Sequence, residues 1–188
     1  MKKIFGVSAV ILIVIIASLG YRSYKHSPLY SLKQAAIALK TGNTETAKKY
    51  IDFSKIINGI FEEQIAKDEE IKNNPFAVGM IEMFKGPMVA AIQTALLNAI
   101  EEGVKRAKEE TNNTQSAQNP QSRNKLIKKV KVLTKKKDFA TVQIVFSGNE
   151  NKKDMPLIVG MQKIDNYWQA VKIMNFDEVK DADFWDEM

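Results

Sequence analysis

Among the side chains that could act as bases or metal ligands, three are considered first because of their positions: His26, Asp52 and Asp165. His26 is the single histidine, and a catalytic base or metal ligand needs partners that the local sequence does not place beside it. We therefore expect His26 to be an interfacial residue. Asp52 lies between Ile51 and Phe53, ahead of an expected helix, so its carboxylate is expected to cap that helix, with a general-base role as the alternative.

The remaining sequence excludes several kinds of catalytic site. It contains no cysteine, which rules out thiol catalysis, thiolate metal sites and disulfides. It has no paired-histidine helix motif, no phosphate-binding glycine loop and no nucleophile elbow. We expect no enzymatic activity, no cofactor and no bound metal. The alternative is an enzyme whose pocket uses Asp52 or Asp165 as its base.

A stripe of large apolar side chains is the strongest candidate for a binding surface. Methionine is flexible and polarizable, and it is frequent at adaptable binding surfaces. Three interpretations stay open: plain core, the wall of an apolar pocket for a lipid-like ligand, or contact with a membrane surface. The candidate ligand surface consists of Phe76, Met80, Met83, Phe84, Met88, Ile92 and Leu96.

Charge is unevenly distributed along a chain that has 28 basic and 22 acidic residues. Residues 123–137 are basic and contain no acid, whereas residues 177–188 are mainly acidic. Aromatic residues are not interleaved with these lysines as they are at surfaces that stack nucleic-acid bases. We expect the basic stretch to be a solvated outer face of a sheet, with contact to anionic headgroups or to the acidic segment as alternatives. We expect no nucleic-acid partner.

The N-terminal segment is expected to tie the protein to a membrane. An uncharged run from Ile4 to Gly20 follows Lys2 and Lys3, and charges resume at Arg22. This run approaches the roughly 20 residues that cross a bilayer, and it is longer than the apolar part of a usual secretory signal. We expect an uncleaved span, with a cleaved signal peptide or a buried helix as alternatives. The span includes Ile4, Val10, Ile15 and Leu19.

Basic residues near this span favour an amino end in the cytoplasm. The expected location is therefore the inner (cytoplasmic) membrane, crossed once, with the domain facing the periplasm or the cell exterior. The expected partners are the membrane itself and a lipid or an envelope protein.

Helical spacing of apolar residues dominates the first part of the domain. Pro87 lies inside the apolar stripe, and an internal proline removes a hydrogen bond and clashes with the preceding turn. We therefore expect two helices there, or one with a sharp bend. Residues 111–122 contain no large apolar residue and are expected to be a flexible linker. The expected helices cover 29–40, a segment from 44, a segment from 54, 76–85 and 87–109.

After the linker, the apolar residues alternate with polar ones, which predicts strands. The spacings between them are short, so neighbouring strands are expected to be antiparallel. A hairpin turn is expected at Asp165-Asn166, and a last helical turn at 182–188. The predicted fold class is α+β: an N-terminal transmembrane helix, then several helices packed on a curved antiparallel sheet of about four strands.

The domain organisation follows from these elements. Residues 1–26 form the membrane anchor and juxtamembrane segment, and residues 27–188 form the extracytoplasmic domain. Within this domain the linker separates a helical part, 27–110, from a sheet part, 123–188.

One set of motifs consists of Ser27-Pro28-Leu29-Tyr30, Leu32, Ala36, Gly42 and Ile51-Asp52-Phe53, with similar character from Asn74-Pro75-Phe76 to Ile100. On these residues the chain resembles a bacterial family of membrane-anchored proteins, domain-of-unknown-function family twenty-nine thirty-nine. The resemblance implies an envelope location and no established activity.

The helices and the segment from Lys163 to Val171 carry a weaker resemblance, to the nuclear-transport-factor-2-like cone fold. This resemblance implies a curved sheet around a long helix with an apolar pocket.

Three functions are compatible with these features. The first is a non-enzymatic, membrane-tethered envelope module that binds a partner protein or an apolar ligand. The second is the pocket enzyme, and the third is a purely structural envelope assembly factor. The lining of the interior distinguishes them: an apolar cavity favours the first, a buried carboxylate the second and a filled interior the third.

Overall fold

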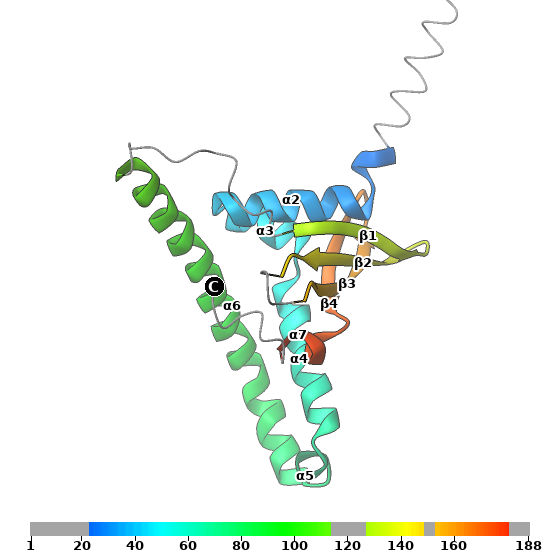
Figure 1. The fold of residues 1–188 in the computed structure, drawn as a ribbon. Coiled ribbons are helices and arrows are strands. Elements are labelled where there is room, and N and C mark those ends of the chain that lie inside the picture. The colour runs from blue at the N-terminus through cyan, green and yellow to red at the C-terminus, as the bar shows by residue number, and fades with distance from the viewer. Residues whose placement is uncertain (1–22, 114–126, 149–152, 181–188) are drawn as a thin grey trace, which may run out of the picture.

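The computed structural model describes residues 23–113, 127–148 and 153–180. Helices come first and a four-stranded antiparallel sheet follows, so the α+β prediction is confirmed (Figure 1). The sheet does not close, and it therefore has two edge strands. The predicted N-terminal span and most of the predicted linker lie outside the described residues.

Three helices follow one another closely: α2 (Pro28–Thr41), α3 (Thr44–Tyr50) and α4 (Phe53–Lys67). Each begins after a residue whose side chain accepts a hydrogen bond from the backbone amide three residues further on, namely Ser27, Asn43 and Asp52. These caps satisfy amide groups that have no partner inside the helix. The predicted cap at Asp52 is therefore confirmed. α2 ends at Gly42, whose φ of 71° is a left-handed conformation that glycine adopts without steric cost.

The sheet consists of β1 (Ile127–Lys135), β2 (Phe139–Phe146), β3 (Met155–Ile164) and β4 (Tyr167–Ile173), in that spatial order. The alternation predicted for β2 is confirmed, since Ala140, Val142 and Ile144 are buried. The predicted turn between β3 and β4 is confirmed as well. Asp165 has a φ of 48° there, a conformation that aspartate tolerates better than most residues.

The inner face of the sheet packs against α2, α3 and α4, and Trp168 on β4 lies at the centre of this contact. Its side chain is 1% exposed, and its indole N–H donates to the His26 carbonyl oxygen at 2.9 Å. Its backbone N–H donates to Oγ of the fully buried Ser31 on α2, also at 2.9 Å. These bonds satisfy polar groups that would be costly to bury alone, and they tie α2 to the sheet.

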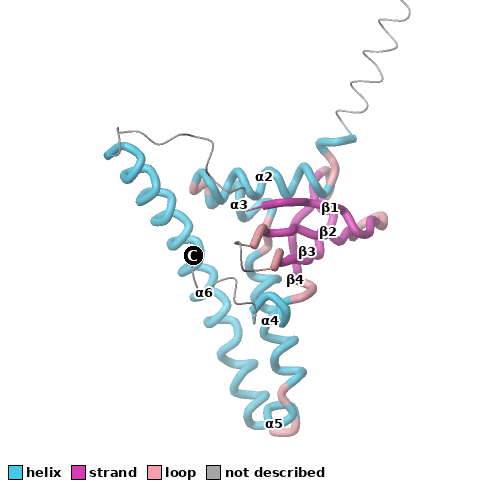
Figure 2. The backbone as a smooth tube through the Cα atoms, viewed as in Figure 1, coloured by secondary structure: helices cyan, strands magenta, loops and turns pink. Residues whose placement is uncertain are grey.

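The structure corrects the prediction for the apolar stripe. Instead of two helices, or one with a sharp bend, one continuous helix, α6, runs from Pro75 to Asn113 with Pro87 inside it (Figure 2). Pro87 is exposed, and so is Met83, the residue whose carbonyl loses its helical partner. A backbone carbonyl on an exposed side of a helix can be solvated, which lowers the cost of the lost hydrogen bond and is consistent with a helix that continues through the proline. α6 also extends into the segment predicted to be a linker.

A helical arm extends away from the sheet (Figure 1). It consists of the second half of α4, the short helix α5 (Glu69–Lys72) and the first half of α6, with α5 at the tip. Among the helices of the described ranges, only Pro75–Glu109 of α6 is long and apolar enough to cross a membrane. This finding depends only on the length and composition of the helix, and core helices of soluble proteins meet the same criterion.

A short helix, α7 (Phe176–Lys180), follows β4. Asn175 lies between β4 and α7, and its side chain forms hydrogen bonds with the backbone of β3 beyond the end of β4. It accepts a hydrogen bond from the Ile158 amide and donates one to the Pro156 carbonyl, each at 2.8 Å. A helix at this position was not predicted, and the predicted helical turn at 182–188 lies outside the described residues.

We predict that the Asp52 cap contributes measurably to stability. The substitution Asp52→Ala removes the acceptor of the Lys55 amide, which lies 2.9 Å from Oδ1, and should lower the free energy of unfolding by about 1 kcal/mol. Asp52→Asn keeps a capping oxygen and should cost clearly less. Urea unfolding of the three proteins, followed by far-ultraviolet circular dichroism, measures the difference; equal stability of all three would contradict the cap.

Candidate functional site

All seven residues of the predicted ligand surface lie on α6, and they are exposed to solvent. The exposed fraction runs from 39% for Met80 to 76% for Phe76. Among the described residues, this stripe is therefore not buried core. A different side of α6 packs on the domain, where Val89 is buried and Leu97 and Ile100 contact the cluster around Phe53.

The packed side of α6 contains polar residues, which explains why the apolar pattern of the sequence predicted a surface on the exposed side instead. Gln93 accepts a hydrogen bond from the Ser54 hydroxyl at 2.6 Å, and Glu101 accepts one from the Thr44 hydroxyl at 3.0 Å. Such residues interrupt the apolar pattern on the side that is packed. The predicted stripe follows steps of four residues, and each such step turns about 40° further around a helix. The stripe therefore winds away from the packed side.

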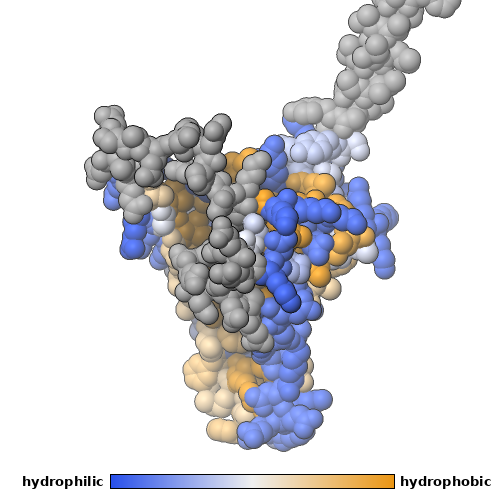
Figure 3. Space-filling model, in the orientation of Figure 1, coloured by the Kyte–Doolittle hydropathy of each residue, from blue (hydrophilic) through white to orange (hydrophobic). Residues whose placement is uncertain are grey.

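An apolar groove, here called the arm groove, separates α6 from α4 and α5 and has a volume of about 720 Å³. It contains Met80, Phe84 and Met88 from the predicted surface, whereas Phe76, Met83, Ile92 and Leu96 are not part of its lining. Figure 3 shows apolar residues gathered along α6 and polar ones along α4 on this view of the arm. The other lining residues are Phe61, Gln64, Ile65, Lys67, Asp68, Ile71, Ile81 and Lys85.

A second apolar hollow, here called the α2 cleft, lies between α2 and the inner face of the sheet. Its volume is about 720 Å³, and all four strands contribute to its wall. Lys33 is its one charged lining residue, and Tyr24 adds a hydroxyl. The other lining residues are Leu29, Leu32, Ala35, Ala36, Leu39, Ile51, Ile56, Ile127, Val130, Ile144, Phe146, Leu157, Val159, Ala170 and Ile173.

Side-chain size explains the α2 cleft. Ala35 and Ala36 on α2 and Ala170 on β4 line it, and alanine leaves space that leucine or phenylalanine would fill. The cleft could not be predicted from the sequence, because it depends on which small residues face each other across two layers. A pair of alanines in a helix above alternating apolar strands was the available signal.

The basic stretch lies where it was expected, as far as it is described. Lys129 and Lys131 on β1 are exposed, and Val130 between them, which is 39% exposed, lines the open α2 cleft. Lys128 pairs with Asp154 at 2.7 Å, and this hydrogen-bonded ion pair lowers the pKa of the Asp154 carboxyl. Positive charge is thus available on the outside of the strand that borders the cleft.

None of the three residues first considered as bases is a lining residue of either hollow. Asp52 is paired with Lys55 at 3.2 Å, and Asp165 is exposed in the β3–β4 turn. His26 contacts the backbone carbonyl of Asn166 through Nδ1. In the described ranges no carboxylate is buried and no group of histidine, aspartate and glutamate side chains is arranged to hold a metal ion.

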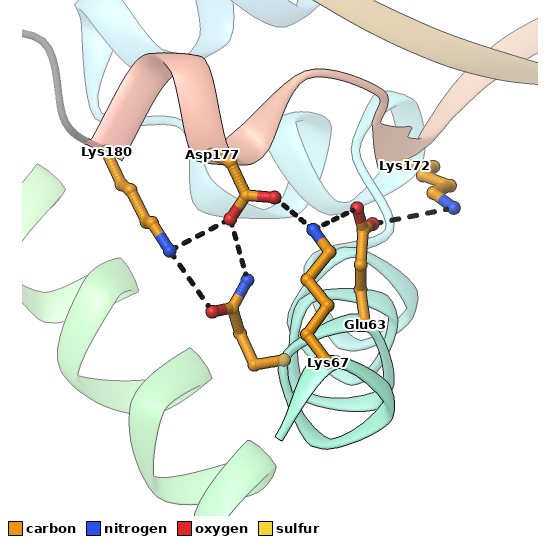
Figure 4. Close-up of polar contacts among 6 residues, drawn as sticks. Glu63, Lys67, Lys172, Asp177 and Lys180 are labelled. Atoms are coloured by element: carbon orange, nitrogen blue, oxygen red, sulfur yellow. Dashed lines mark hydrogen bonds and ion pairs between the residues drawn. The ribbon is translucent and has the colours of Figure 1, made fainter. Parts of the chain in front are cut away.

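A polar network joins α7 to α4 beside the arm groove (Figure 4). Lys67 pairs with both Asp177 and Glu63, and Lys180 pairs with Asp177 at 2.9 Å. Gln64 donates a further hydrogen bond to Asp177 at 3.1 Å. Lys67 foremost, then Lys180 and Gln64, hold the pKa of the Asp177 carboxyl well below its usual range.

Comparison of the chain with protein-family models, curated proteins and solved structures finds no match. The function therefore has to be inferred from the two apolar hollows, the exposed side of α6 and the charges around them.

We predict that acid weakens the attachment of α7 to α4. The pKa of Asp177 is lower in the folded protein than the value of about 3.9 in an unfolded chain, so its stabilising effect is present above that value and is lost as the pH falls below it. The fall in melting temperature between pH 6 and pH 3 should be smaller for Asp177→Asn than for the wild type. Asp165→Asn, which removes a carboxylate that pairs with no cation in the described ranges, should behave like the wild type; a similar change in both variants would contradict the prediction.

Proposed function

We propose that this protein is a membrane-tethered envelope module that binds a single-chain, lipid-like ligand with an anionic headgroup in the α2 cleft. The apolar tail of the ligand would lie between α2 and the sheet. Lys33 at the cleft would pair with the headgroup.

The observation that carries this proposal is the composition of the cleft wall. Ligand sites of small molecules are usually apolar hollows of roughly 300–1,000 Å³ with a few polar groups that orient the ligand. The α2 cleft has a volume of about 720 Å³ and a wall that is apolar except at Lys33 and Tyr24. Lys33 forms no ion pair with the described carboxylates, so its ammonium group is available to a ligand.

The position of the cleft in the chain supports a lipid as the ligand. Tyr24, one of its lining residues, follows the apolar N-terminal run by only four residues. If that run spans the inner membrane once, with the domain on the periplasmic or exterior side, the cleft begins near the lipid surface.

The exposed side of α6 favours a second candidate function, the binding of a partner protein. A run of exposed apolar residues on one helix commonly marks a surface that binds another protein. Met83, Ile92 and Leu96 are 61%, 41% and 42% exposed and lie outside the arm groove. The pocket-enzyme alternative has less support, because Asp52 and Asp165 line neither hollow.

We predict that filling the α2 cleft abolishes lipid binding. Ala36 lines the cleft, so Ala36→Phe should occupy the space of the ligand and remove the lipids that co-purify with the full chain. Ile37, the next residue on the same helix, is 45% exposed and outside the cleft, which makes Ile37→Phe the matched control. Native mass spectrometry of both variants in detergent measures the bound lipid. Equal lipid in both variants, or none in the wild type, would contradict the proposal and favour a protein partner.

We predict that Lys33 selects the headgroup. Exposed ion pairs contribute roughly 0.2–1 kcal/mol, so Lys33→Gln should weaken palmitate binding by a few-fold at most. Binding of the neutral alcohol with the same chain should not change. Lys40→Gln, on the same helix but outside the cleft, serves as the control in calorimetric titrations. An equal effect on the acid and the alcohol would assign Lys33 a packing role instead.

A further inference from the structure

Two residues that line the arm groove, Gln64 and Lys67, also hold α7 in place. Lys180 donates a hydrogen bond to Oε1 of Gln64 at 3.2 Å. Because Lys180 is the last residue of α7, the chain leaves this helix at the border of the groove.

The eight residues after α7, here called the tail (181–188), have the composition that the groove would accommodate. Phe184 and Trp185 are adjacent, and Met188 ends the chain. Each aromatic side chain can bury about 150–250 Å² of surface, and the groove offers aliphatic and aromatic walls on both sides. The tail also carries four acids, and the charged residues of the groove lining are Lys67, Lys85 and Asp68. Because Lys67 already pairs with Glu63 and Asp177, and Lys85 with Glu62, the apolar walls rather than the charges favour the tail as occupant.

The tail is long enough to reach the groove from its attachment point. An extended chain advances roughly 3.3–3.6 Å per residue, so Trp185 can lie up to about 17 Å from Lys180. The lining residues of α6, from Met80 to Met88, span about 12 Å along the helix axis. Both aromatic residues can therefore enter the groove without any change in α7.

We propose that the tail of the same chain occupies the arm groove, with Phe184 and Trp185 between α4 and α6. The apolar groove then belongs to the interior of the domain, and any partner that binds there has to displace the tail. This proposal is independent of the ligand in the α2 cleft, because the two hollows have no lining residue in common.

Fluorescence of the full chain in detergent tests the proposal, because the chain has only two tryptophans and Trp168 is buried. Subtracting the spectrum of Trp185→Phe from that of the wild type isolates the emission of Trp185. A docked Trp185 should emit at shorter wavelength and be quenched by acrylamide several-fold less than in urea. Equal quenching in buffer and in urea would overturn the proposal.

Paired variants on α6 distinguish the groove from other environments. Phe84 lines the groove and is 48% exposed, whereas Ile92 is 41% exposed and lies outside it, so both positions should accept a charge without unfolding. Phe84→Asp should expose Trp185 to acrylamide, and Ile92→Asp should not. Insertion of Trp185 into the micelle would make Phe84→Asp ineffective and would overturn the proposal. If Trp185 loses its protection from acrylamide when the protein is diluted 100-fold, the groove is occupied by the tail of a second copy, and the proposal is overturned.

Cross-linking gives a second measurement that does not depend on a charged variant. The natural sequence has no cysteine, so a pair of introduced cysteines reacts without competition. A disulfide requires Cα atoms within roughly 7 Å. Phe184→Cys with Met80→Cys should cross-link within one chain several times faster than Phe184→Cys with Ile92→Cys. Equal rates for the two pairs would overturn the proposal.

Discussion

The burial of Trp168 against α2 is the contact on which the rest of the domain depends. Its indole and its backbone amide each donate a hydrogen bond to the N-terminal part of the helical layer, one to His26 and one to Ser31. At the other end of α2, Gly42 turns the chain where Val104 of α6 approaches, 3.4 Å from the position of an added Cβ. The helix is thus fixed at both ends. Between these ends, alanines face the sheet, and the α2 cleft is the space that they leave.

The sheet could be predicted from the sequence because one simple rule determines it. Alternation places Ala140, Val142 and Ile144 on the inner side, and the Asp165-Asn166 pair supplies the turn. The helix caps could be predicted for a similar reason, since each depends on a side chain and an amide three residues away. These features are local, and local physical chemistry determines them.

The candidate sites could not be predicted in the same way, because they depend on contacts between elements. The packed side of α6 contains Gln93 and Glu101, whose partners lie on α4 and α3. Pro87 was expected to break a helix, yet its position on the exposed side makes the lost hydrogen bond tolerable. The α2 cleft depends on which residues face each other across two layers, and no single segment contains that information.

The two edges of the open sheet differ, and the difference bears on how the protein avoids aggregation. The edge strand β1 carries Lys128, Lys129 and Lys131, and repeated lysines oppose the pairing of two identical edges. Along β4, Ile51 forms a backbone bridge with Ala170, and the Asp52 amide donates to the Ala170 carbonyl at 2.9 Å. One edge is thus protected by charge and the other is partly covered by the chain itself. Copies of this domain at high local concentration would therefore resist joining into continuous intermolecular sheets.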